Sequence, residues 1–151
     1  AAVPRYGVAV PPVRPSSDAS ALETVLNAAR SLAAERVGDL RGPDAEIEPF
    51  AVVHTARGLV PVLLDGVAEH LATPDGTNRV AGSLLHQFDA DAFALATPWH
   101  ASPDGTAEHP QAREVLRIIV GHVGGSSTAA FAEIERRPEG PRLAPVWETI
   151  A

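Results

Sequence analysis

The feature that most constrains the fold is an amphipathic pattern over residues 20–38, SALETVLNAARSLAAERVG. Its apolar residues recur at intervals of three and four, which places them on one face of a helix. They are Leu22, Val25, Leu26, Ala29, Leu32, Ala33 and Val37. Ser20 and Glu23 have the spacing of a capping box, and Gly38 can end the helix. The apolar face needs a second layer of structure to cover it.

Two further patterns follow this helix. Residues 50–66, FAVVHTARGLVPVLLDG, predict two short strands joined at residues 55–58, with Gly58 in a conformation of positive φ. Pro61 cannot donate to a strand ladder, so the second strand should lie at a sheet edge or carry a bulge. Residues 77–90, TNRVAGSLLHQFDA, predict a second helix with a cap at Thr77 or Asn78. Its apolar face contains Val80, Ala81, Leu84, Leu85 and Phe88.

From Ala92 the pattern is that of β-structure. Segments of strand length are separated by turn-forming residues, and they cover residues 92–100, 114–123, 127–137 and 142–150. Residues 111–120 also fit a helical face, but the β-branched run from Ile118 to Val120 favours a strand. The strand interpretation sets His100 and His122 at opposite ends of the sheet, whereas a helix could bring them together.

These patterns predict an α+β protein with two helices packed on one face of a mainly antiparallel sheet. The sheet consists of the N-terminal hairpin and a C-terminal strand meander. Residues 1–17 are rich in proline and lack a helical period, so we expect an extended arm. Residues 18–151 are expected to form one domain, since a chain of 151 residues can bury a single core.

Composition excludes several classes of function. The chain has no cysteine, which removes disulfides, thiolate nucleophiles and cysteine-based metal sites. Its net charge is −7, which argues against nucleic-acid binding, and no apolar run is long enough for a membrane span. All twelve basic residues are arginine, a bias typical of GC-rich bacterial genomes. Residues 1–15 lack a signal-peptide pattern, and we expect a cytoplasmic location.

The segment from Trp99 to His109 contains the candidate catalytic residues. His100, Asp104 and His109 could supply a general base with an orienting carboxylate, and Trp99 and Trp147 could line an apolar pocket. The spacing matches no known metal or triad signature, and polar residues are also common in solvated loops. Catalytic roles for these residues are therefore a hypothesis, set against a loop without chemistry.

Two other groups are candidates for ligand or metal binding. Arg136 and Arg137 flank a tight turn and could hold a carboxylate or phosphate, although nearby glutamates can balance them. Asp89 and Asp91 would point to one side of a strand and could bind Mg²⁺ or Ca²⁺. Two ligands are too few for a metal centre, and the histidines are dispersed. We therefore predict no metal and no cofactor.

The preferred functional hypothesis is a non-catalytic protein-interaction or structural module that self-associates. The proline-rich arm and the strand edge at Pro61 motivate it, because both can meet another chain. The partner would be a second copy or another protein, not nucleic acid or a membrane. The alternative is a small-molecule enzyme or binding protein that uses the His100–His109 loop. The sequence leaves open whether the protein is an enzyme.

Overall fold

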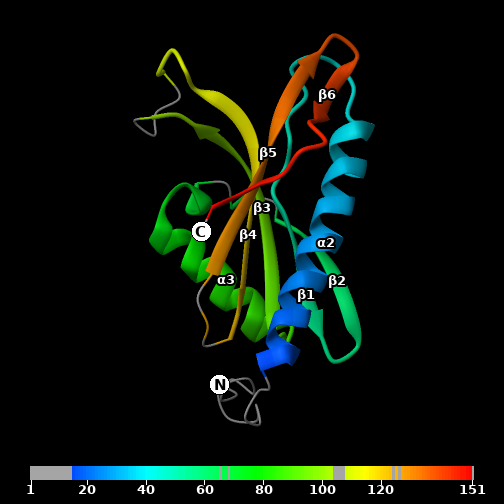
Figure 1. Ribbon diagram of the computed structural model, residues 1–151, viewed down its shortest axis with the longest axis vertical. Coiled ribbons are helices and arrows are strands. Elements are labelled where there is room, and N and C mark those ends of the chain that lie inside the picture. Colours follow the sequence, from blue (N-terminus) through cyan, green and yellow to red (C-terminus); the bar gives the residue numbers. More distant parts are fainter. Residues whose placement is uncertain are drawn as a thin grey trace.

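The protein is an α+β structure, and its described residues form a curled antiparallel sheet and two α-helices (Figure 1). The computed structural model describes residues 15–64, 66–67, 69–103, 108–123, 125 and 127–150. The helical elements are α2 (Pro15–Asp39), the 3₁₀ turn η1 (His70–Ala72) and α3 (Pro74–Gln87). The strands are β1 (Phe50–Thr55), β2 (Gly58–Leu63), β3 (Ala92–Ala101), β4 (Arg113–His122), β5 (Ser127–Arg137), β6 (Gly140–Leu143) and β7 (Glu148–Ile150).

The strand order is β2-β1-β3-β4-β5-β6, with β7 also paired to β5. Residues 113–122 form a strand, which confirms the strand interpretation of that segment. The predicted fourth strand block is divided, because β6 pairs with the C-terminal end of β5 while β7 pairs with residues 129–131. The break falls at Pro145, a residue without a backbone N–H for a ladder.

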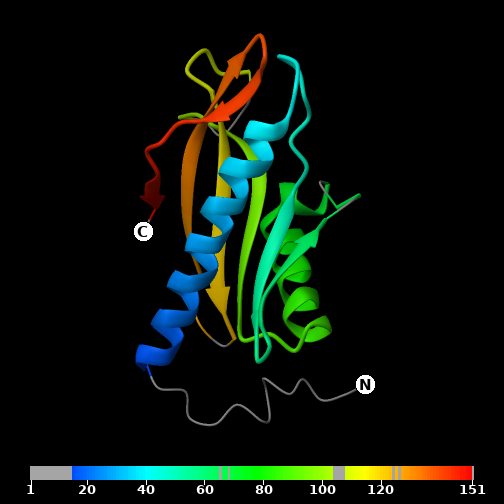
Figure 2. The ribbon, with the colours of Figure 1, turned by 90° about the vertical axis from the view of Figure 1, so that its right-hand side faces the viewer.

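The two helices lie on opposite faces of the sheet, so the predicted arrangement on one face is wrong (Figure 2). Alternate residues of the central strand β3 explain this. Ala92, Ala94 and Ala96 belong to the apolar cluster that contains the inward face of α2. Phe93 and Leu95 belong to the cluster that contains the inward face of α3. A strand that is apolar at every position is buried on both faces, and each face then needs its own cover.

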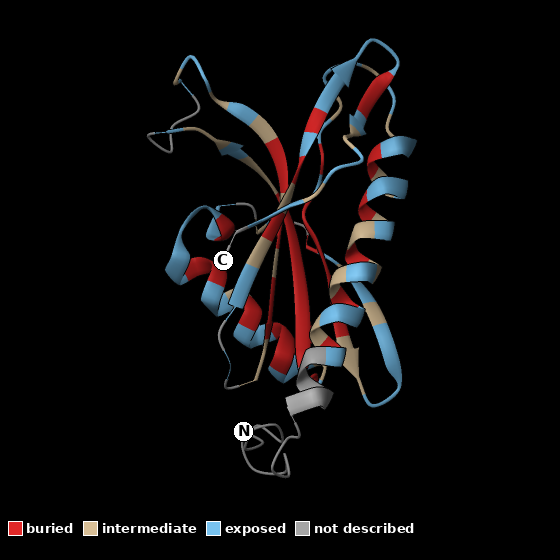
Figure 3. Cartoon of the chain, viewed as in Figure 1, coloured by how far each residue is buried: buried red, intermediate tan, exposed pale blue. Residues whose placement is uncertain are grey.

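Small side chains line the contact between α2 and β3. The inward face of α2 is fully or almost fully buried and repeats every four residues, at Ala21, Val25, Ala29, Ala33 and Val37. It faces the alanines of β3, which are also buried (Figure 3). The larger residues Leu22, Leu26 and Leu32 of the predicted stripe are only partly buried, at the margin of the same cluster. The helix therefore packs on the sheet through its smallest apolar residues.

Both helices begin earlier than predicted. α2 starts at Pro15, so Ser20 is inside the helix, where its carbonyl accepts a hydrogen bond from the Thr24 hydroxyl (2.7 Å). The last three residues of the predicted arm therefore belong to α2, and residues 1–14 lie outside the described part of the chain. α3 is capped by Thr73, whose Oγ1 accepts a hydrogen bond from the Gly76 N–H (3.0 Å), rather than by Thr77 or Asn78. A proline in the first turn fits this start, since no N–H is needed there.

The β1–β2 hairpin has the predicted form. Gly58 closes the turn with φ of 113°, which only glycine adopts readily. β2 is an edge strand, as the position of Pro61 predicted. The helix-forming pattern of α3 is also confirmed, because Ala81, Leu84 and Leu85 are buried against the sheet.

The alanine contact between α2 and β3 can be tested by overpacking. Ala29→Leu adds bulk where the exposed fraction is 0%, and we expect a loss of about 1–3 kcal/mol in the free energy of unfolding. Ala34→Leu is the matched control, because Ala34 is on the exposed face of the same helix. Urea denaturation followed by circular dichroism measures both. Equal stability of the two variants would show that α2 does not pack closely on β3.

Candidate functional site

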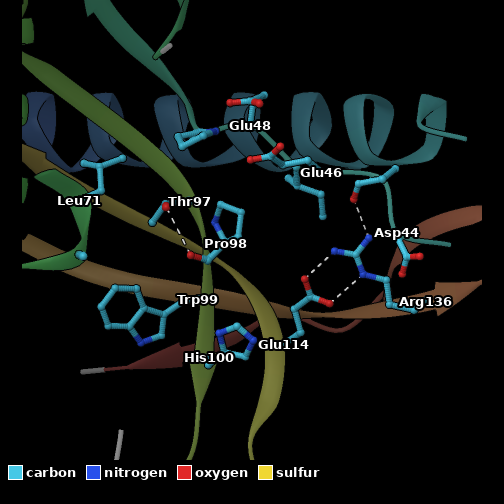
Figure 4. Close-up of a pocket in the computed structure, with 14 residues that line it drawn as sticks. Asp44, Glu46, Glu48, Leu71, Thr97, Pro98, Trp99, His100, Glu114 and Arg136 are labelled. Carbon is cyan, nitrogen blue, oxygen red and sulfur yellow. Dashed lines mark hydrogen bonds and ion pairs between the residues drawn. The ribbon is translucent and has the colours of Figure 1, made fainter. Parts of the chain in front are cut away.

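A cleft of about 660 Å³ lies beside the C-terminal half of β3 (Figure 4). One wall is the segment of residues 44–49, which leads from α2 to β1. The floor is the strand segment from Thr97 to His100, with Leu71 and Ala72 at one end and Glu114 and Arg136 at the other. The cleft therefore contains three of the residues singled out from the sequence, namely Trp99, His100 and Arg136.

The cleft exists because β1 is shorter than β3. The pairing of β1 with β3 stops at Phe50 opposite Ala96. Beyond that point, residues 97–101 pair with β4 on one side only, in the part of the chain that the structure describes. The segment of residues 44–49, which precedes β1, lies away from β3 instead of continuing the β1–β3 ladder. The edge of β3 at residues 97–101 is therefore free on this side and forms the floor of the cleft. Pro98 lies on this free segment, a position that suits a residue without an N–H.

A bidentate ion pair fixes one end of the cleft. The Arg136 guanidinium donates from Nε to Glu114 Oε1 (2.8 Å) and from Nη2 to Oε2 (2.6 Å). Its third nitrogen, Nη1, donates to the backbone carbonyls of Ala45 (2.6 Å) and Pro43 (3.3 Å). Arg136 thus joins β4, β5 and the loop after α2. Planar guanidinium–carboxylate pairs of this kind are geometrically specific.

This ion pair changes the titration of both partners. The hydrogen bonds from Arg136 hold the pKa of Glu114 below its ordinary value, against the opposing effect of partial burial, and the charge of His100 adds a smaller lowering. In turn, the hydrogen bonds to Glu114 raise the pKa of Arg136. Both groups are therefore charged at neutral pH. Arg136 has its carboxylate partner inside the chain, so the structure does not support its predicted role as a ligand-binding residue.

The other candidate arginine is also paired internally. Arg137 Nη2 lies 2.9 Å from Glu135 Oε1 on the exposed surface of β5. The predicted carboxylate or phosphate site at Arg136 and Arg137 is replaced by two intramolecular pairs. Glu135 near the turn balances Arg137, as the sequence allowed, whereas Arg136 is balanced by Glu114 of β4.

Three exposed acidic side chains remain along the loop wall. They belong to Asp44, Glu46 and Glu48, which alternate with the less exposed Ala45 and Ile47. Arg136 is the one permanently cationic residue among the described residues that line the cleft, and Glu114 neutralises it. The cleft consequently presents an excess of negative charge. The signal in the sequence is the alternating pattern DAEIEP of residues 44–49, which the sequence analysis did not use.

The two tryptophans do not share a pocket. Trp99 points to the same face of β3 as Phe93 and Leu95, which pack against α3. The Arg117 guanidinium stacks over the Trp99 ring, 3.8 Å from its centroid. Trp147 packs against the cluster on the other face, with Arg30 at 5.6 Å. Figure 4 shows Trp99 and the Glu114 side chain on opposite sides of β3. The predicted pocket between Trp99 and Trp147 is therefore wrong, because the two rings lie on opposite faces of the sheet.

The candidate catalytic group is only partly within the described structure. His100 is exposed at the end of the cleft, opposite Glu114 in the β3–β4 register. His109 Nδ1 accepts a hydrogen bond from the Gln111 backbone N–H (3.0 Å). Asp104 lies outside the described residues. The carboxylate opposite His100 in the register is Glu114, which is already bound by Arg136. The predicted pairing of His100 or His109 with Asp104 stays a prediction.

The remaining histidines are dispersed, and the strand register explains why. His122 lies opposite Ala92 and is thus eight residues from His100 along the pair. His54 and Asp91 form a contact that the sequence analysis missed, with 2.7 Å between Nδ1 and Oδ1. Asp91 therefore faces a histidine rather than a second carboxylate. Among the described residues there is no group of three potential metal ligands.

A second hollow of about 460 Å³ lies between α3 and the edge strand β2, with Leu63 58% exposed at its margin.

The backbone of β2 determines how Pro61 meets the sheet edge. The Leu64 N–H donates to the Pro49 carbonyl (3.3 Å), so Leu64 and every second residue before it direct their backbone N–H and C=O groups toward β1. Pro61, which lies opposite Val52, then turns its nitrogen to the free edge. A proline nitrogen has no hydrogen, and this protects the edge from addition of a further strand. The edge at Pro61 is therefore a weaker docking site than the sequence suggested.

Comparisons of the chain with protein-family models, curated proteins and solved structures give no match. In the described residues, neither long helix is apolar enough over a sufficient length to cross a membrane. The function has to be argued from the site itself.

The Glu114–Arg136 pair gives a pH-dependent prediction. Glu114→Gln removes the charge but keeps the shape, and we expect a loss of about 1–2 kcal/mol in the free energy of unfolding at pH 7. Because the pKa of Glu114 is lowered in the folded state, the difference between the two proteins should shrink as pH falls through that lowered pKa.

Urea denaturation at pH 7 and pH 3 measures this difference. Glu135→Gln is the control, since Glu135 pairs with Arg137 on the exposed surface. A Glu114→Gln penalty that stays constant down to pH 3 would contradict a stabilising charge on Glu114.

Proposed function

We propose that the protein is a non-catalytic interaction module, which binds an extended, positively charged polypeptide segment in the cleft beside β3. The supporting observation is the free edge of residues 97–101, bordered by an acidic wall on the loop side. The acidic side chains are exposed and the guanidinium of the cleft is neutralised internally, which favours a cationic ligand. The proposal includes self-association and a cytoplasmic location in a GC-rich bacterium. The net charge of −7 supports a protein partner rather than nucleic acid.

The shape of the cleft favours a proline-rich segment. Polyproline II chains make no internal backbone hydrogen bonds and lose little entropy on binding. They dock on aromatic and apolar surfaces, here supplied by the partly exposed Trp99 and Pro98. They also need no regular ladder with the strand edge, and Pro98 interrupts the donors at that edge.

The alternative function, a small-molecule enzyme or binding protein at the His100–His109 loop, has less support. It requires an imidazole with an available carboxylate, but Glu114 opposite His100 is held by two hydrogen bonds to Arg136. The cleft is also open and acidic, whereas small-molecule sites are commonly enclosed and mostly apolar.

The binding proposal can be tested with a short fluorescent peptide of repeated Pro-Pro-Val-Arg units. We expect saturable binding to the full chain by fluorescence anisotropy, with an affinity that falls as salt is added. Glu46→Arg combined with Glu48→Arg should weaken binding about tenfold or more, because the wall changes sign.

Two controls make this experiment specific. Glu23→Arg combined with Glu35→Arg changes net charge equally on the exposed face of α2 and should leave affinity within about twofold of the wild type. A peptide with glutamate in place of arginine should not bind. Equal binding of both peptides, or equal loss in both protein variants, would refute a charge-selective cleft.

A further inference from the structure

We propose that the occupant of the cleft is the segment of residues 1–14 from a second copy of this chain. This inference rests on the proposed function and identifies its ligand. Each copy would place its N-terminal segment in the cleft of the other, which gives a closed, two-fold symmetric dimer.

The chemistry of the segment complements the cleft. Residues 1–14, AAVPRYGVAVPPVR, contain three prolines and two arginines, Arg5 and Arg14, and no acidic residue. The chain as a whole has 19 acidic and 12 basic residues, so this composition is local to the segment. The cleft supplies the opposite features, with Asp44, Glu46 and Glu48 along one wall and apolar groups at its floor. Arginine guanidinium groups pair well with such carboxylates.

The length of α2 keeps the end of the segment that adjoins the helix out of the cleft of its own chain. The segment ends where α2 begins, at Pro15. The cleft lies near the other end of α2, because the Arg36 guanidinium is 5.6 Å from the ring of Phe50, two residues after Glu48. The helix between Pro15 and Arg36 spans about 31 Å at 1.5 Å per residue.

The basic and proline-rich end of the segment is the part closest to α2. Arg14 directly precedes the helix in the sequence, and the four residues from Pro11 to Pro15 can span at most about 14 Å when fully extended. Neither can reach the cleft of the same chain, which lies about 31 Å away. A second copy in the opposite orientation removes this restriction, since its α2 then begins near the cleft of the first.

A charge exchange between two variants tests the proposal. One variant carries Arg5→Glu and Arg14→Glu, and the other carries Glu46→Arg and Glu48→Arg. In a dimer of either variant, like charges meet in both clefts. In a mixed dimer, each segment meets a cleft of opposite charge. Sedimentation equilibrium measures the masses, and circular dichroism verifies that each variant is folded.

We expect the wild type to approach twice 15.8 kDa as concentration rises. Each variant alone should dimerise at least tenfold more weakly, and an equimolar mixture should recover the wild-type dissociation constant within about threefold. The variant with Glu23→Arg and Glu35→Arg should dimerise as the wild type does, because its charges lie outside the cleft.

Three outcomes would overturn the proposal: a wild type that remains monomeric, variants that dimerise normally, or a mixture that does not recover. If the wild type is monomeric but binds the Pro-Pro-Val-Arg peptide, the cleft binds a different chain and only the dimer proposal fails. If it neither dimerises nor binds that peptide, the proposed function fails as well.

Discussion

Close packing of α2 on β3 positions the other elements of the structure. Alanines on both sides of this contact let the helix lie against the central strand, and the exposed fractions of Ala29, Ala33, Ala92, Ala94 and Ala96 are all 0%. The residues of β3 between these alanines, Phe93 and Leu95, are large and fill the opposite layer with α3. The strand therefore uses small residues on one face and large residues on the other, and this difference allows a long straight helix on the first face.

The cleft follows from how this layer ends. β1 pairs with β3 only as far as Ala96, and the loop from α2 is held away from the strand by Arg136 through the carbonyls of Pro43 and Ala45. The same guanidinium binds Glu114, which would otherwise add a further charge to the cleft. Arg136 thus positions the loop wall, and its own charge is neutralised by Glu114. The exposed carboxylates of the loop then dominate the electrostatics, which motivates a cationic ligand.

Local patterns predicted a large part of the fold. The two helices, the hairpin with Gly58, the edge position of Pro61 and the strand at residues 113–122 all depend on side-chain periodicity or on restricted φ, and both act within a few residues. The helix starts were less accurate, because Thr73 and Thr77 offer similar local caps and only the 3₁₀ turn before α3 selects the first. The site was predicted in part, since Trp99, His100 and Arg136 do line the cleft. Its acidic wall was missed.

The sequence by itself determined the secondary structure and the class of the fold, because helical and strand periods are properties of short segments. Tertiary structure decided which face of the sheet each helix covers, which carboxylate Arg136 binds, and that Trp99 and Trp147 lie on opposite faces. These relations depend on strand register and on residues far apart in the chain. A shift of one residue in that register would exchange the two faces, so no local pattern contains this information.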